Sequence, residues 1–147
     1  MAHFLSLGLA AHLAGTGSMK SALDGGFINI YAGAVPADAN ASIGAATLLA
    51  KVSISSGATG LTLTQDGRYL RKPAGDTWSG TNAASGVATF YRHVEATDDG
   101  SASTTLKRTQ GAVGLTNAAE MTLVDTAFVS GATFPLNSYV LELPLYA

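Results

Sequence analysis

The stretch Gly86-Val87-Ala88-Thr89-Phe90-Tyr91-Arg92-His93-Val94 decides the fold class of this 147-residue chain. Valine, threonine, phenylalanine and tyrosine are the residues most enriched in β-strands, because their branched or aromatic side chains pack well on a pleated surface. Turn-forming residues flank the stretch on both sides, with Ser85 before it and Asp98-Asp99-Gly100 after it. We therefore predict that this stretch is the strongest strand of the protein.

Shorter stretches of the same kind lie on both sides of it. The expected strands are 27–31, 47–54, 61–63, 68–70, 104–113, 121–124 and 137–143. The pair Asp66-Gly67 is a hairpin signal between two of them. Segment 104–113 contains the basic pair Lys107-Arg108, which favours an edge strand with polar faces. Segment 73–85, with its Pro, Gly and Ser residues, is typical of a loop.

This spacing of strands and turns predicts an all-β protein, with an antiparallel β-sandwich or a jelly-roll-like arrangement. The N-terminal part differs, because Leu5, Leu9 and Leu13 recur at helical spacing before a natural stop at Gly15. We therefore expect a single domain over residues 1–147. It consists of a short α-helical N-terminal arm at 1–23 and a β core at 27–143.

Charged residues are scarce in this chain. Asp, Glu, Lys and Arg make up 12% of it, with a net charge of −2, against roughly 25% charged residues in an ordinary domain. The basic residues are scattered, so we expect no nucleic-acid binding. No run approaches the roughly 18 apolar residues that cross a bilayer, so we expect no membrane association. The N-terminus also lacks the basic start of a signal peptide.

Few charges are available to repel neighbouring copies of this chain. The composition therefore favours a component of a larger assembly over a free enzyme.

Patterns typical of catalysis or cofactor binding are weak. The absence of cysteine removes disulfides, thiol nucleophiles and cysteine-bound zinc. Segment 15–21 is similar to a phosphate-binding loop, but Met19 stands where that loop needs glycine. Three histidines, His3, His12 and His93, lack the spacing of a metal-binding pair. We therefore expect no catalytic residue, no cofactor and no metal.

Two features leave alternatives open. Glu95, Asp98 and Asp99 lie together after the strongest strand, where paired carboxylates could serve hydrolysis or hold a hard cation; the Asp-Asp-Gly-Ser sequence favours a turn. The single tryptophan, Trp78, either fills the core or anchors a neighbouring protein, since tryptophan is enriched at interface hot spots.

A resemblance to a known family begins at the first expected strand. The segment is Leu23-Asp24-Gly25-Gly26-Phe27-Ile28-Asn29-Ile30-Tyr31-Ala32-Gly33-Ala34-Val35-Pro36. It resembles the opening of a widespread family of small structural proteins of tailed bacteriophages, in which a glycine-led strand is followed by a Tyr-x-Gly-x-x-Pro loop. Further matches follow in order: Gly44-Ala45-Ala46-Thr47-Leu48-Leu49 (one residue longer than the family spacing), Trp78-Ser79-Gly80-Thr81, Ala84-Ser85-Gly86-Val87-Ala88, Gln110-Gly111-Ala112-Val113-Gly114 and Ser130-Gly131-Ala132-Thr133.

The resemblance spans nearly the whole chain and rests on structural glycines and strand residues. It implies a component of the virion, assembled in the host cytoplasm, that forms a homo-oligomer and contacts the major capsid protein or other virion proteins. We expect a capsid decoration or cement protein. The expected interaction residues are Phe4, Leu5, Leu9, Leu13 and Trp78.

Two alternatives remain at this stage. The chain could be a tail, neck or fibre-associated virion protein. It could also be a carbohydrate- or receptor-binding β-sandwich, with Trp78, Tyr69 and Tyr91 stacking on sugar rings.

Overall fold

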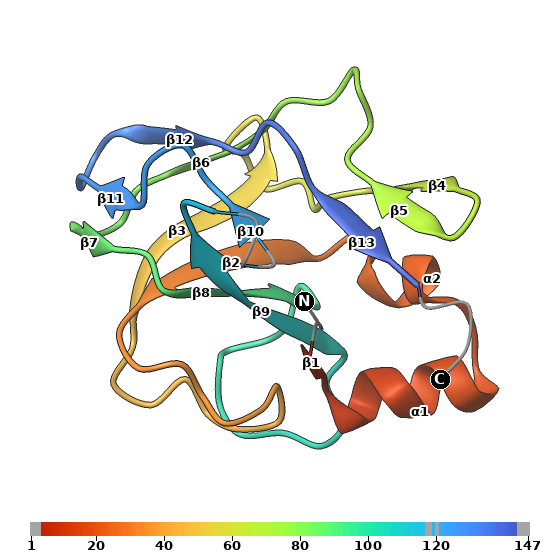
Figure 1. The fold of residues 1–147 in the computed structure, drawn as a ribbon. Coiled ribbons are helices and arrows are strands. Elements are labelled where there is room, and N and C mark those ends of the chain that lie inside the picture. Colours follow the sequence, from red (N-terminus) through yellow and green to blue (C-terminus); the bar gives the residue numbers. More distant parts are fainter. Residues whose placement is uncertain (1–3, 117–118, 120, 144–147) are drawn as a thin grey trace.

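The protein is a mostly β structure with two short helices near its N-terminus (Figure 1). This computed structural model describes residues 4–116, 119 and 121–143. The helices are α1 (Leu7–Gly15) and α2 (Met19–Leu23). The strands are β1 (Phe4–Leu5), β2 (Phe27–Ala32), β3 (Thr47–Ile54), β4 (Thr64–Asp66), β5 (Tyr69–Arg71), β6 (Trp78–Thr81), β7 (Gly86–Val87), β8 (Phe90–Val94), β9 (Arg108–Gly114), β10 (Met121–Thr122), β11 (Ala127–Phe128), β12 (Thr133–Pro135) and β13 (Val140–Glu142). Neither helix is long and apolar enough to cross a membrane.

The largest sheet has the strand order β1-β9-β8-β2-β3-β6-β12. Its neighbours pair antiparallel, and β10 joins beside β9 as a parallel partner. Strand β8 lies between β2 and β9, where Tyr31 pairs with Phe90 and Arg92 pairs with Gln110. The stretch that decides the fold class therefore supplies a central strand. That strand is Phe90–Val94, separated from the two-residue β7 by Ala88 and Thr89.

A smaller sheet, β13-β5-β4, shares the core with one face of the large sheet. Leu70 and Leu141 from the small sheet belong to the same buried cluster as Ile30, Val52 and Tyr91 from the large one. The predicted hairpin at Asp66-Gly67 joins β4 to β5, and Gly67 has the positive φ of +60° that such a turn favours. The predicted all-β, antiparallel, sandwich-like class with a short N-terminal helix is confirmed.

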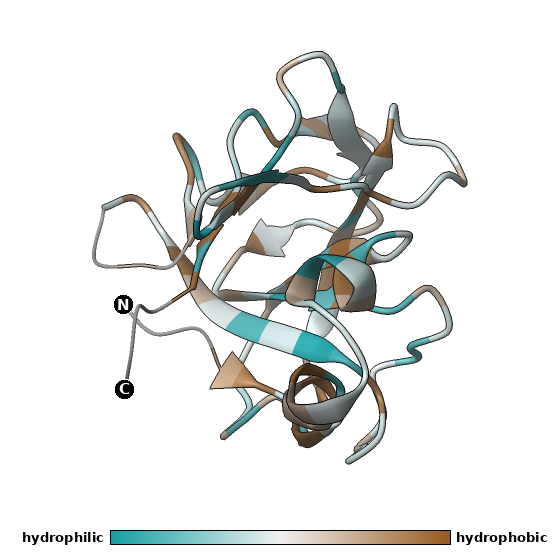
Figure 2. Ribbon diagram, turned by 90° about the vertical axis from the view of Figure 1, so that its right-hand side faces the viewer, coloured by the Kyte–Doolittle hydropathy of each residue, from teal (hydrophilic) through white to brown (hydrophobic). Residues whose placement is uncertain are grey.

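The other face of the large sheet is covered by two long connections. One is the strap, which we define as residues 33–46 between β2 and β3, and the other is the connection 95–107 between β8 and β9. Polar side chains of β8 and β9 fill the space beneath them, with Arg92, Arg108 and Gln110 all buried. Figure 2 shows hydrophilic residues along β9, although this strand lies inside the sheet.

Three strand predictions are corrected. The strand expected at 61–63 lies instead at β4, Thr64–Asp66. Residues 78–81, expected in a loop, form β6 between β3 and β12, and a Cβ on Gly80 would lie only 2.4 Å from the Lys51 carbonyl oxygen. Glycine here permits the close approach of two backbones, not a turn. Residues 104–113, expected as an edge strand, contribute β9, which has β1 on one side and β8 on the other.

The N-terminal helix exists where the leucine spacing predicts it, and it packs on the β core. Ser6 caps α1 by accepting a hydrogen bond from the Leu9 backbone N–H at 3.1 Å. The same Oγ accepts from the Arg108 N–H at 2.9 Å and donates to the Leu106 carbonyl at 2.7 Å. Because Ser6 and Leu9 are both buried, this arm is an integral part of the fold.

Candidate functional site

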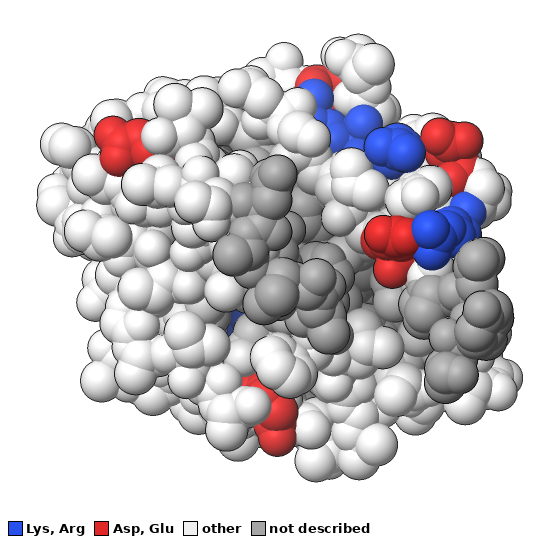
Figure 3. All heavy atoms as spheres, viewed as in Figure 1, with Lys and Arg blue, Asp and Glu red and all other residues white. Residues whose placement is uncertain are grey.

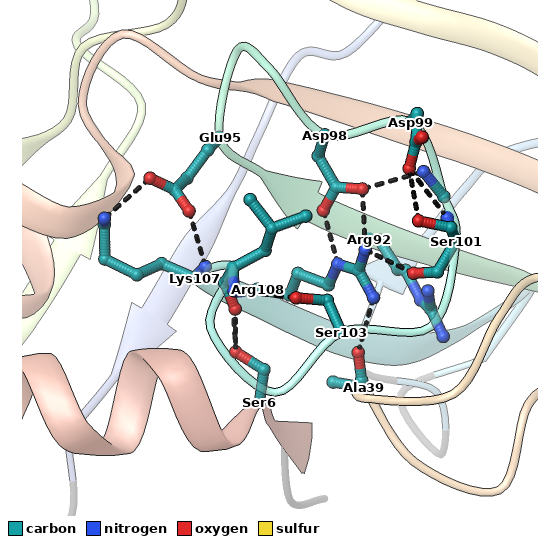
Figure 4. A network of polar contacts seen from close by, with 12 residues as sticks. Ser6, Ala39, Arg92, Glu95, Asp98, Asp99, Ser101, Ser103, Lys107 and Arg108 are labelled. Carbon is teal, nitrogen blue, oxygen red and sulfur yellow. Dashed lines mark hydrogen bonds and ion pairs between the residues drawn. The ribbon is translucent and has the colours of Figure 1, made fainter.

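The three carboxylates after the strongest strand are all engaged within the chain (Figure 4). Asp98 accepts two hydrogen bonds from the Arg108 guanidinium, through Nε and Nη2. Glu95 pairs with Lys107 Nζ at 2.6 Å and accepts from the Lys107 backbone N–H at 2.7 Å. Asp99 accepts from the Ser101 N–H and hydroxyl, which lowers the pKa of its carboxyl. This arrangement agrees with the turn interpretation and leaves no paired carboxylates facing a cleft.

The strap is held down by side chains from the sheet. Arg92 Nη2 donates to the carbonyl oxygens of Asp38 at 3.2 Å and Ala41 at 2.7 Å. Gln110 accepts from Arg92 Nε at 2.9 Å and donates to the Pro36 carbonyl, also at 2.9 Å. Burial lowers the pKa of Arg92, and the nearby Arg108 charge lowers it further. The polar cluster fastens a loop to a sheet, and its groups are not open to a ligand.

An aromatic cluster surrounds His93 on the core face of the sheet. Its Nδ1 lies 3.2 Å from the Tyr139 hydroxyl, and the two ring centroids are 5.6 Å apart. Trp78 and Tyr91 contact the same Tyr139 ring. Burial lowers the pKa of His93 to about 4 and raises that of Tyr139. A neutral histidine in a closed aromatic core is typical of packing and not of proton transfer.

Metal binding finds no support in residues 4–116, 119 and 121–143. No group of three or more His, Asp or Glu side chains lies close enough together there to hold an ion. His12 Nε2 lies 3.0 Å from the Ser21 hydroxyl, and His93 is enclosed in the core. His3 lies outside the described residues.

The expected interaction residues divide into two groups. Phe4 and Leu5 on β1 are exposed, by 51% and 39%, so both are available to a partner. Leu9 is buried, and Leu13 is partly buried against the core. Trp78 is only 1% exposed, so the core interpretation of the tryptophan describes this fold.

The sugar-binding alternative depended on exposed aromatic rings. Trp78 and Tyr91 are both closed to solvent, and Tyr69 is partly buried with the guanidinium groups of Arg68 and Arg71 near its ring. An open aromatic platform made by these three residues is therefore absent.

The most distinctive surface lies around β6, β7, β11 and β12, and we call it the neutral face. Segments 78–91 and 109–141 contain only two charged residues, Glu120 and Asp125. In Figure 3, charged side chains gather on the side of β4, β5 and β13, whereas the side with β7, β11 and β12 is almost entirely uncharged. Val87, Val124 and Val129 are exposed on these elements or beside them.

A groove of about 480 Å³ is part of the neutral face. Leu123, Phe128, Phe134 and Leu136 contribute its apolar lining, and Asp125 is the one charged residue that borders it. The Phe128 and Phe134 ring centroids are 4.8 Å apart. An exposed apolar surface beside a groove is typical of protein–protein contact.

This face was not predictable from the overall composition, although its signal lies in the sequence. The shortage of charged residues is concentrated in segments 78–91 and 109–141.

Comparisons of this chain with protein-family models, with curated proteins and with solved structures found no match.

Proposed function

We propose that this chain is a non-enzymatic structural component of a tailed-bacteriophage virion, and that it serves as a capsid decoration or cement protein. The observation that carries the proposal is the neutral face, where exposed valines surround an apolar groove on a surface with little charge. The family resemblance of the sequence supplies the kind of particle.

The interior of the protein supports a structural role as well. Its buried polar groups fasten loops to the sheet: Arg108 with Asp98, and Arg92 with the strap. Arg108 uses Nε, Nη1 and Nη2 as donors, and buried polar groups that are satisfied in this way rigidify a fold. A rigid body with an apolar face suits a component that is repeated many times on a particle. Burial contributes roughly 25 cal/mol per Å² of apolar surface, so even modest contacts add up over a shell.

The proposed partners are the major capsid protein or other virion proteins, and further copies of this chain. Phe4 and Leu5 are the proposed contact of the N-terminal arm, because they are exposed on β1, at one edge of the large sheet. Ser6, which accepts a hydrogen bond from the Arg108 N–H, fixes the start of α1 against β9. A partner would therefore meet the arm in its docked position.

Copy number per purified particle tests the proposal directly. Quantitative mass spectrometry against the major capsid protein should find on the order of hundreds of copies, since a shell lattice repeats every contact by symmetry. About a dozen copies would instead favour a tail, neck or fibre-associated position, where cyclic symmetry sets the number. Absence from the particle would overturn the virion proposal.

The arm contact has its own test. Replacing Phe4 and Leu5 together by serine should leave the fold intact, because both side chains are exposed, but should reduce the amount of protein bound per particle. Replacing Val140, which is exposed on β13 of the smaller sheet, by serine is the control. Equal binding by both variants would remove the arm from the proposal.

A further inference from the structure

On the neutral face, an exposed apolar side chain lies at the border of the groove. Val124 borders the groove and its side chain is fully exposed. The hollow beside it is lined by Phe128, Phe134 and Leu136. A fully exposed valine next to an apolar hollow has no folding role, because it buries nothing within its own chain.

The charges on this surface restrict what can cover it. The only charged residue among those that line the groove is Asp125, and its Oδ1 already accepts a hydrogen bond from the Ala127 N–H at 2.9 Å. The other polar lining residues are neutral, namely Asn82, Thr122, Thr133, Asn137 and Ser138. A basic or acidic partner would therefore find almost nothing to pair with. An identical neutral face meets no such obstacle, because among the described residues that line the groove only one carboxylate per copy, Asp125, repels its counterpart.

We propose that the neutral face is the contact between two copies of this chain, related by a two-fold axis, with Val124 of each copy entering the groove of the other. A two-fold contact joins the same patch on both subunits, so the patch must be complementary to itself. A projection and a hollow side by side on one surface meet that requirement. This inference rests on the self-association included in the proposed function and names the surface that carries it.

The contact has a distinctive electrostatic consequence. Residue 125 follows Val124 directly, so a two-fold axis at this surface brings the two Asp125 carboxylates toward each other. Their repulsion opposes association and is screened by salt. Dimerisation should therefore strengthen with ionic strength, and removal of the charge by Asp125→Asn should strengthen it at low salt.

Analytical ultracentrifugation of the full chain over a wide concentration range tests the proposal. The wild-type protein should form a concentration-dependent dimer, and Val124→Asp should weaken dimerisation about tenfold or more, equivalent to at least 1.4 kcal/mol. Leu7→Asp is the control, because Leu7 is another exposed apolar residue, on α1, and it does not line the groove. Asp125→Asn should tighten the dimer severalfold at low salt.

Several results would overturn the two-fold contact. These are a wild-type monomer at every concentration, an assembly other than a dimer, and equal effects of Val124→Asp and Leu7→Asp. Thermal unfolding verifies that each variant is folded, and the milder Val124→Ser replaces Val124→Asp if that variant does not fold. Particle binding is measured separately, so a monomer that still binds particles disproves only the dimer, and a dimer absent from particles disproves only the virion role.

Discussion

Arg108 and Asp98 meet with both side chains closed to solvent, and the guanidinium donates to both carboxylate oxygens. Asp98 lies in the connection after β8 and Arg108 begins β9, so the pair closes the 95–107 connection on itself. The Arg108 guanidinium also donates to the Ser101 carbonyl at 2.7 Å and to the Ala39 carbonyl at 3.2 Å. One ion pair thereby organises both long connections on this face of the sheet.

Removing the carboxylate from this pair should be strongly destabilising. Asp98→Asn leaves the Arg108 charge buried without a counter-charge, and breaking a buried pair in this way costs about 3–5 kcal/mol. Urea unfolding at neutral pH should show that loss as a lower midpoint. The adjacent Asp99→Asn is the matched control, since Asp99 is exposed and only caps the turn at Ser101. Similar midpoints for the two variants would contradict the assigned role of the pair.

The stability of the protein should fall as the pH is lowered from about 6.5 toward 4. His93 has a pKa of about 4 in the folded protein because burial disfavours its charged form, against 6.5 when exposed. Between these values the unfolded chain binds more protons, so the free energy of unfolding rises with pH and levels off above 6.5. At 1.36 kcal/mol per pKa unit, the effect amounts to about 3 kcal/mol.

Denaturant unfolding at several pH values measures this dependence. His93→Asn places an amide near the Tyr139 hydroxyl and should flatten the curve in the window between pH 4 and 6.5. His12→Asn is the control, because His12 lies on α1 outside the core. An unchanged slope in His93→Asn would show that His93 does not titrate in this window.

The strap should loosen when Arg92 loses its guanidinium. Arg92→Met keeps a long side chain but removes the donors to the Asp38 and Ala41 carbonyls. The change also takes the donor away from Gln110 Oε1, and a buried acceptor left without a partner costs about 1–3 kcal/mol, so global stability should fall as well. The amide of Ile43, which donates to the Gly100 carbonyl at 3.0 Å, should exchange its hydrogen faster.

A neighbouring cation supplies the control for the strap. Lys51 stands across β2 from Arg92, but it is exposed and its Nζ lies over the Phe27 ring at 3.9 Å. Lys51→Met should leave exchange at Ile43 unchanged. Equal exchange in the two variants would show that the arginine does not hold the strap.

The β class was predictable because it depends on local composition and turns. The hairpin at Asp66-Gly67 and the central strand near Phe90 express preferences of their own residues. The errors arose where tertiary contacts outweigh those preferences. A basic residue such as Arg108 favours an exposed edge by itself, yet Asp98 pairs with it and permits full burial. A glycine such as Gly80 in a Ser- and Gly-rich segment favours a loop, yet here it permits two strands to approach closely.

The candidate site was less predictable than the fold. An interaction face is a property of the assembled surface, and Val124 and Phe134 come together only through the turn that joins β11 to β12. The local sequence indicates contact residues at the N-terminus, where leucines recur at helical spacing, and at Trp78, which the fold buries. The same spacing could not show that Leu9 faces inward whereas Phe4 and Leu5 lie on the surface.

Two glycines of the same helix should respond oppositely to substitution by alanine. A Cβ on Gly8 would lie 2.3 Å from the Thr105 carbonyl oxygen, whereas a Cβ on Gly15 would meet nothing within 4 Å. Alanine is favoured over glycine in a helix by about 1 kcal/mol, so propensity alone would make both changes stabilising. We expect Gly15→Ala to raise the melting temperature and Gly8→Ala to lower it, because Gly8→Ala forces α1 away from residues 105–106.

The comparison separates docking of the arm from formation of its helix. Circular dichroism should show similar helical signal in both variants, while hydrogen exchange at the Arg108 amide, which donates to Ser6 Oγ, should accelerate only in Gly8→Ala. If both alanine variants melted above the wild type with that amide still protected, α1 would not be packed closely on the 103–107 backbone. If only Gly8→Ala melts lower, the N-terminal arm contributes to the stability of the β core through this one close contact.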